Sequence, residues 1–190
     1  MRIISGAFKG RKLHSPQGLS VRPTSDRTRE SIFNILSSSF ETFDGRRVLD
    51  LYAGTGAFGI EALSRGAHRA AFVEMEKHAL AALQHNVSFI PDPGRYDIIG
   101  MPVASAIKLL HKKGAQFDLI FMDPPYGKNL VQTTLEAIAE TGLFTRQALV
   151  LCEHFIRDSI PEQYGTLRRF DTRQYGQTLV SFFSITGPRG

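Results

Sequence analysis

The chain has 190 residues, enough for one domain with a substantial core, and its 42% hydrophobic and 22% charged residues are typical of soluble globular proteins. No apolar run approaches the roughly 20 residues that cross a bilayer, and the first residues lack the long apolar region of a secretory signal. Cys152 is the only cysteine, which excludes a disulfide within the chain and favours a cytoplasmic location. The six histidines lack the paired spacing of a zinc site, so we expect no metal.

The formal charge of +5 is concentrated near the N-terminus. Residues 1–29 contain seven basic residues and one acidic residue, a net charge of +6, and the rest of the chain sums to −1. A neutral body with a basic arm favours a polyanionic partner, with nucleic acid first and an acidic membrane second. A solvated basic surface is the alternative.

The first segments differ from the rest of the chain. Residues 2–16 have short apolar stretches interrupted by glycines and a proline, which is typical of a hairpin or an extended arm. Apolar residues then recur at helical spacing after Ser25, with Ser25 or Thr24 as a possible N-cap. We expect a basic N-terminal arm over residues 1–40, followed by one domain over residues 41–190.

Strands and helices alternate after Gly45. Candidate strands lie at 47–52, 70–74, 96–100, 117–123 and 148–153, and helical patterns lie between them at about 57–65, 77–89, 103–113 and 129–140. Apolar strands that alternate with helices predict an α/β domain with a mostly parallel, doubly wound sheet. The segments 167–176 and 178–186 resemble two antiparallel strands that close one edge.

A glycine-rich turn follows the first of these strands. Gly54, Gly56 and Gly59 fit the pattern G-x-G-x-x-G, and Glu74 ends the next strand 20 residues after Gly54. The glycines let the backbone approach a ligand closely, and Glu74, or Glu76 beside it, can accept hydrogen bonds from ribose hydroxyls. A tight structural turn without a ligand is the alternative.

Asp50 distinguishes between two nucleotide-like ligands. It lies at the end of the first strand, four residues before Gly54, and its carboxylate would repel the pyrophosphate of NAD. S-adenosylmethionine (SAM) carries an ammonium and a sulfonium and no phosphate. At ~4 Å and an intermediate dielectric, one charge pair contributes a few kcal/mol before desolvation, and its sign is opposite for the two ligands. The sequence therefore favours SAM.

The segment FMDPPYGKN, residues 121–129, follows the fourth strand and should open into the same crevice as the glycine-rich turn. Pro124 and Pro125 have a fixed φ and no backbone N–H, so the Pro124 carbonyl and the Asp123 carboxylate can be held as acceptors for an exocyclic amino group. Tyr126 offers a flat face on which a flipped-out or unpaired base can stack. The predicted chemistry is methyl transfer to an amine, promoted mainly by positioning.

These motifs resemble those of amino-methyltransferases with a D/N-P-P-Y/F sequence, and the N-terminal segment narrows the resemblance. MRIISGAFKGRKLHSPQGLSVRPTSDRTRESIFNIL closely resembles the opening of the bacterial RsmD family, the 16S ribosomal RNA guanine-N2 methyltransferases. The resemblance continues through LDLYAGTGAFGIEALSRGA, FVEMEKHA and FDLIFMDPPYG to Tyr175-Gly176, and so covers nearly the whole chain. DPPY alone is weakly specific, whereas DPPY together with RPTSDRTRE is strongly specific.

The resemblance implies a Rossmann-like, SAM-dependent fold and methyl transfer to N2 of a guanine in 16S rRNA, within a 30S subunit or an assembly intermediate. It implies no membrane and no obligate protein partner. It implies that S-adenosyl-L-methionine is bound by Asp50, Tyr52, Gly54, Gly56, Glu74 and Met75. It implies that the acceptor amine is oriented by Asp123, Pro124 and Tyr126. It implies RNA contacts by Arg22, Thr24, Arg27 and Arg29, and we expect phosphate contacts by Arg2, Lys9, Arg11 and Lys12.

Other readings of these motifs stay open. DNA adenine-N6 methyltransferases share DPPY, although they usually carry a DNA-reading domain for which this chain has little room. Protein glutamine methyltransferases typically have Asn in place of Asp123. A noncatalytic RNA-binding protein with a degenerate pocket is a further alternative, which the intact acidic residues oppose.

Two details depart from a simple assignment. Arg27 and Arg29 could form ion pairs with acidic neighbours on their own helix instead of contacting RNA. Related enzymes often accept a hydrogen bond from the adenine N6 amine with an acidic or amide side chain after the third strand. No such side chain lies near Val103, where backbone groups or Ser105 would have to substitute.

Overall fold

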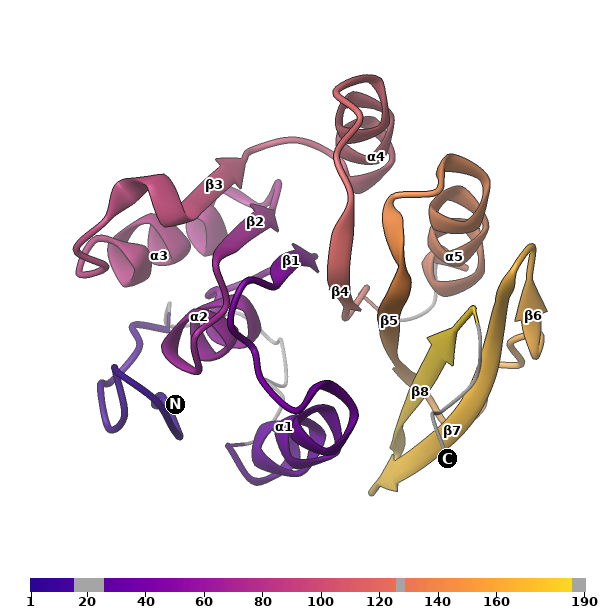
Figure 1. Cartoon of the computed structure of the whole chain (residues 1–190), viewed down its shortest axis with the longest axis horizontal. Helices are drawn as coiled ribbons and strands as arrows, with labels where there is room; N and C mark the ends of the chain where they lie inside the picture. Colours follow the sequence, from indigo (N-terminus) through magenta and orange to yellow (C-terminus); the bar gives the residue numbers. More distant parts are fainter. Residues whose placement is uncertain (16–25, 126–128, 186–190) are drawn as a thin grey trace.

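The computed structural model describes residues 1–15, 26–125 and 129–185, and a single mixed sheet forms the centre of this part of the chain (Figure 1). Its strand order is β3-β2-β1-β4-β5-β8-β7-β6. The strands are β1 Arg47–Leu51, β2 Arg69–Val73, β3 Tyr96–Ile99, β4 Phe117–Met122, β5 Phe144–Phe155, β6 Gln163–Tyr164, β7 Leu167–Tyr175 and β8 Thr178–Ser184. The helices are α1 Asp26–Phe40, α2 Ala57–Ser64, α3 Lys77–Val87, α4 Val103–Lys112 and α5 Leu130–Thr141, with a short 3₁₀ helix at Pro93–Arg95.

The pairing of the strands changes once across the sheet, from parallel to antiparallel, at β5. β3, β2, β1, β4 and β5 run parallel to their neighbours, whereas β8, β7 and β6 are added antiparallel. The predicted parallel α/β sheet with an antiparallel C-terminal edge is therefore confirmed. The connections after β1 and β4 leave in opposite directions along the sheet, so the switch point of the topology lies between these two strands, where ligands bind in doubly wound folds.

Helices cover both faces of the sheet, as alternating strands and helices predict. On one face, apolar residues of α1, α2 and α3 pack with Val48 and Phe121 in a buried cluster that includes Phe33 of α1. On the other face, α4 and α5 pack on Leu49 and Ile120 in a second cluster. Figure 1 shows α1, α2 and α3 grouped together, apart from α4 and α5. Successive residues of β1 and β4 thus alternate between two buried faces.

The N-terminal residues 1–15 fold back on themselves and dock on α2. An isolated antiparallel bridge joins Arg2 and Lys12, which confirms a hairpin-like turn, although it is not built from regular strands. Glu61 of α2 is completely buried and its carboxylate accepts hydrogen bonds from Ile4 N at 2.7 Å and Ser5 N at 3.0 Å. Arg65 donates to the same carboxylate at 2.8 Å. A buried acid therefore anchors the arm.

The start of β5 and the presence of β6 differ from the sequence prediction. β5 begins at Phe144, four residues before the predicted start, and its pairing with β4 changes register between Phe117 and Leu119. The residues after Phe144 are polar and break the apolar pattern of the strand, so the sequence did not predict that β5 starts there. The two-residue β6 is too short to leave any periodicity in the sequence. The predicted caps of α1, Ser25 and Thr24, lie outside the described residues.

No helix in the described ranges is long and apolar enough to cross a membrane.

Replacing Glu61 with alanine should destabilise the protein by roughly 2 to 4 kcal/mol, because two backbone N–H groups and Arg65 lose their buried acceptor. Urea unfolding followed by circular dichroism measures the change. Glu140→Ala on the exposed surface of α5 is the control and should change the free energy of unfolding by less than about 0.5 kcal/mol. An equally small change for Glu61→Ala would show that the arm is not anchored in this way.

Candidate active site

The glycine-rich turn between β1 and α2 packs directly against the neighbouring strand and helix. A Cβ atom on Gly59 would lie 2.3 Å from Cε1 of Phe72, and one on Gly56 would lie 2.4 Å from Cδ1 of Leu83. Gly56 also has a φ of 79°, in the left-handed region that favours glycine. Gly59 therefore lets α2 approach β2 closely, and Gly56 lets the turn approach α3.

Asp50 is buried beneath this turn, with 1% of its surface exposed. Among the described residues its carboxylate accepts one hydrogen bond, from Gly59 N at 3.0 Å. Burial raises the pKa of Asp50 to about 8, the negative charge of Glu74 adds to this, and the Gly59 hydrogen bond opposes it. The sequence assigned Asp50 to the positively charged groups of SAM. In the structure, ionising this buried carboxyl group costs free energy.

Glu74 is fixed at the end of β2 by backbone donors. Its Oε2 accepts from Gly54 N at 2.8 Å, and its Oε1 accepts from Met75 N at 2.8 Å and Glu76 N at 2.7 Å. Oε2 accepts only one of these hydrogen bonds and keeps a second lone pair, so Glu74 can still accept from a ribose hydroxyl. Glu76 instead caps α3 by accepting from Ala79 N at 2.7 Å, which favours Glu74 for the ribose.

Tyr52 and Met75 flank the turn in different ways. Tyr52 has a φ of 59°, and its hydroxyl lies 2.8 Å from Oγ1 of Thr134 on α5. The side chain therefore ties the turn to the helix that follows DPPY. Met75 has 65% of its surface exposed, beside Glu74. An exposed thioether at this place offers an apolar, polarizable surface to a flat ring.

The acceptor side of the site contains a pair of acids. Asp123 directly follows β4 and Glu153 lies on β5 with 4% of its surface exposed. Met122 pairs in register with Cys152, so the next residues on the two strands, Asp123 and Glu153, are neighbours. Burial raises the pKa of Asp123 well above its usual range, and the negative charges of Glu153 and Asp50 add to this.

The sequence prediction missed Glu153. In the sequence, Glu153 is the single acid of the otherwise apolar segment ALVLCE, which is the next predicted strand after DPPY.

The chemistry of these acids fits a cationic ligand. Asp50 and Asp123 each have a pKa raised by burial and by another acid, and neither has an ion pair with a Lys or Arg among the described residues. A cation bound at Asp50 would replace repulsion with attraction on the donor side. Such a site suits the ammonium and sulfonium of SAM and would reject a pyrophosphate.

In the described ranges no group of three or more His, Cys, Asp or Glu is arranged to hold a metal ion.

The residues expected to contact RNA are divided among three environments. Arg2, Lys9, Arg11 and Lys12 are exposed on the arm, and Arg27 is exposed on α1. Arg22 and Thr24, like Tyr126 of DPPY, lie outside the described residues.

Arg29 does not lie on the surface. It has 1% of its surface exposed, and its Nη2 donates to the backbone oxygen of Arg2 and to Oδ1 of Asp26, the latter at 3.0 Å. Arg29 thus forms the ion pair within α1 that was the alternative to an RNA contact. Its guanidinium also joins the arm to the helix. It is therefore not placed to contact RNA as expected.

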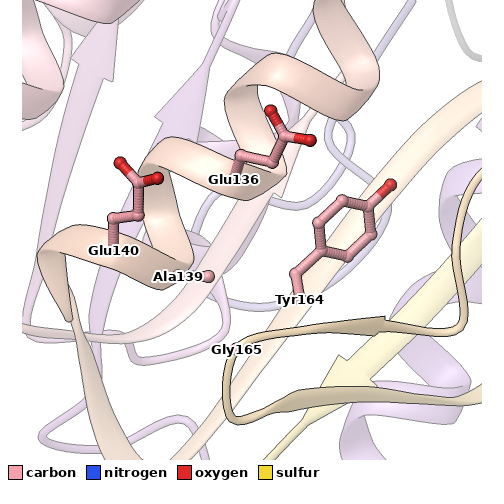
Figure 2. A pocket seen from close by; sticks show the side chains of 5 residues that line it. All are labelled: Glu136, Ala139, Glu140, Tyr164 and Gly165. Atoms are coloured by element: carbon pink, nitrogen blue, oxygen red, sulfur yellow. The ribbon is translucent and has the colours of Figure 1, made fainter.

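A separate depression lies between α5 and β6 (Figure 2). Glu136 and Glu140 project from the helix, and Tyr164 stands on the facing strand. The lining residues are Glu136, Ala139, Glu140, Tyr164 and Gly165, none of which belongs to the predicted site.

Comparison with known proteins identifies the family. A family model described as "Conserved hypothetical protein 95" matches residues 1–184. "Ribosomal RNA small subunit methyltransferase D" of Escherichia coli K12 is 33% identical over 85% of this chain and 78% of that protein. The chain belongs to the RsmD family. "Putative rRNA methyltransferase YlbH" of Bacillus subtilis is 35% identical and covers 98% of this chain and 100% of its own length.

Solved structures agree with this assignment. The "Putative methyltransferase yhhF from Escherichia coli" superimposes with a TM-score of 0.82 at 31% identity and covers 96% of both chains. The Rossmann-like methyltransferase fold and the family resemblance of the sequence are therefore confirmed.

Replacing Asp50 with asparagine should raise the stability of the ligand-free protein, and by more at pH 8 than at pH 5. The folded-state pKa of about 8 lies above the unfolded value of 3.8, so the folded protein binds the extra proton between these values. The wild-type fold therefore loses stability as pH rises through this window, and the asparagine variant does not.

Melting temperatures at pH 5 and pH 8 measure this effect. Asp97→Asn, at an exposed ion pair with Arg69, is the control and should show no such pH dependence. A difference between Asp50→Asn and wild type that is the same at both pH values would contradict the burial argument.

Proposed function

We propose that this protein transfers the methyl group of SAM to the exocyclic N2 amine of a guanine in 16S rRNA, presented by a 30S subunit or an assembly intermediate. One observation carries the proposal: Asp50 under the glycine-rich turn is on β1, Asp123 of DPPY directly follows the adjacent strand β4, and both are at the same end of the sheet. Membership of a family whose Escherichia coli and Haemophilus influenzae members are named as small-subunit rRNA methyltransferases supports the choice of RNA.

The donor side would hold SAM through charge and backbone contacts. SAM supplies a methyl group bound to a cationic sulfur. Asp50 would balance the positive charge of the ligand, and Glu74 would accept from its ribose hydroxyls. Gly54 and Gly56 would admit the ligand close to the backbone, with Tyr52 bracing the turn and Met75 lying beside the adenine. These roles agree with the acid cluster described above.

The acceptor side would orient the amine. The Asp123 carboxylate and the Pro124 carbonyl would accept its two N–H groups, so that its nitrogen faces the methyl group. A carboxylate at this place also stabilises the positive charge that develops on nitrogen during transfer. Tyr126 would stack on the base, in keeping with its place in the motif.

We propose that residues 1–40 form the RNA-binding arm and residues 41–190 the methyltransferase domain. The exposed basic residues of the arm would contact phosphates and position the RNA without reading its sequence. The side-chain amide of Asn86 on α3 donates to both His14 O and Thr55 O at 2.9 Å, and its Oδ1 accepts from His14 N at 2.7 Å. The arm is thus held at a defined place relative to the glycine-rich turn.

Replacing Asp123 with asparagine should reduce methyl transfer by about a hundredfold or more, because the carboxylate charge that favours the developing cation is lost. SAM affinity measured by calorimetry should stay within about threefold of wild type, since Asp123 serves the acceptor side. Wild-type activity in the variant would refute the assigned role. Asp97→Asn is the matched control.

Product analysis tests the base and the substrate. With labelled SAM, 16S rRNA and 30S particles should yield N2-methylguanosine after digestion to nucleosides. N6-methyladenosine would instead support the adenine methyltransferase alternative, and incorporation into naked rRNA alone would contradict the 30S particle as substrate.

Replacing Lys9, Lys12 and Arg27 together with alanine should weaken RNA binding and make its salt dependence shallower. Three lost phosphate contacts should reduce the slope of log K against log salt by about 2. The control is the triple change of Lys108, Lys112 and Lys113, which removes the same charge from the exposed side of α4. Equal effects of the two triple variants would show that net charge, and not the arm, determines affinity.

A further inference from the structure

We propose that Glu153 is a positioning residue for methyl transfer: it forms a carboxyl pair with Asp123, and this pair takes up the proton that the guanine amine loses. The inference rests on the proposed function and adds to it a residue and a destination for the proton. It explains why the apolar segment 148–152 of β5 is followed by a buried acid next to DPPY (Figure 1 shows β4 and β5 side by side).

The register of the sheet brings the two carboxyl groups together. β4 and β5 are parallel, with Phe121 opposite Leu151 and Met122 opposite Cys152. The next position on each strand is Asp123 on β4 and Glu153 on β5. In a parallel pair, residues in register point to the same face, so these two side chains share one side of the sheet.

Alternation along the strands identifies that side. Phe121 and Leu151 belong to the cluster under α1, α2 and α3, whereas Met122 and Cys152 belong to the opposite cluster. The two acids follow on the side of Phe121, and so does Asp50, which is in register with Phe121 on β1. Asp123 therefore lies between the donor-side acid on β1 and Glu153 on β5.

The charges around the pair are mostly acidic. Val180, in register with Glu153 on β8, is apolar and buried. Two charged groups of the covering helices are paired elsewhere, because Arg29 binds Asp26 and Glu61 binds Arg65. Among the residues that the structure describes, Asp50 on β1 adds a negative charge near Asp123, and the Cys152 thiol on β5 lies near both acids. Each carboxylate of the pair therefore makes its partner more basic.

Methylation of an amine requires a proton acceptor. The lone pair of the guanine N2 nitrogen forms the new N–C bond, and the electron pair of the broken C–S bond stays on sulfur, which becomes neutral. The nitrogen is then cationic and must release one proton to become a neutral secondary amine. Asp123, which would accept an N–H hydrogen bond from this amine, receives the proton as a carboxylate, and its basicity is raised by Glu153.

Replacing Glu153 with glutamine should make methyl transfer less dependent on pH. Asp123 becomes less basic, so the acid limb of the pH–rate profile should shift down by about one pH unit. On the alkaline plateau the rate should fall by up to about tenfold, because a weaker base accepts the proton less readily. The ratio of variant to wild-type rate should therefore fall as pH rises.

Two further variants complete the measurement. Glu153→Asp keeps the charge and should keep the position of the acid limb. Glu162→Gln removes a charge from an 88% exposed side chain after β5 and should leave the profile as in wild type. A ratio of Glu153→Gln to wild-type rates that is constant across the pH range would overturn the proposal, since a purely structural role predicts a uniform loss.

A titration of the wild-type protein tests the pair without any change at residue 153. The Asp123 side-chain carboxyl is followed by ¹³C NMR in the free protein and assigned by its loss in Asp123→Asn. A midpoint well above the usual aspartate value of about 4, with two steps, is expected for a coupled pair. One step near 4 would overturn the proposal. Wild-type protein that methylates no RNA at any pH would contradict the proposed function, and the titration would still report on the pair.

Discussion

The contact between Gly59 and β1 and β2 determines how the rest of the site is arranged. The Cα of Gly59 lies against the Phe72 ring, where a side chain would not fit, and its N–H donates a hydrogen bond to Asp50. Phe58, the preceding residue, stacks on Phe121 of β4 with ring centroids 3.9 Å apart. The first turn of α2 is therefore in contact with three adjacent strands. Because of this close approach, α2 begins over the switch point of the sheet. Asp50 is buried there with one backbone donor among the described residues.

The acids of the site oppose folding in the absence of a ligand. Ionising Asp50 or Asp123 costs free energy because each is removed from water and lies near another acid. The large apolar clusters on both faces of the sheet compensate for this cost. A core of this size allows the protein to keep an arrangement that is unfavourable by itself and that becomes favourable when a cation enters. Proteins commonly retain local strain of this kind at functional sites.

The sequence predicted the positions of the central strands along the chain and their mostly parallel direction well, because their apolar runs and the glycine-rich turn are local signals. It placed Asp50, Glu74 and Asp123 at one end of the sheet for the same reason. It could not predict the start of β5 at Phe144, since Thr145 and the residues after it are polar and pair through an irregular register.

Long-range contacts account for the remaining differences. Arg29 resembles the other basic residues of the arm in sequence, and its burial depends on the backbone of Arg2, which is 27 residues away. Glu153 becomes noticeable only when β5 lies beside β4. Neither relationship has a local pattern, so neither could be read from composition or spacing.

Asn86 shows how strongly a single position on a helix can be constrained. Its amide donates to the carbonyls of residues 14 and 55 and accepts from the N–H of residue 14, and only 2% of its surface is exposed. An aspartate there could accept but not donate, a glutamine would carry one methylene too many for the space, and an alanine would leave three backbone groups without a partner. Position 86 should therefore tolerate fewer substitutions than the neighbouring positions of α3, including exposed ones. In a survey of variants of this chain, intolerance at this position would indicate an arm that is built into the fold and not merely attached to it.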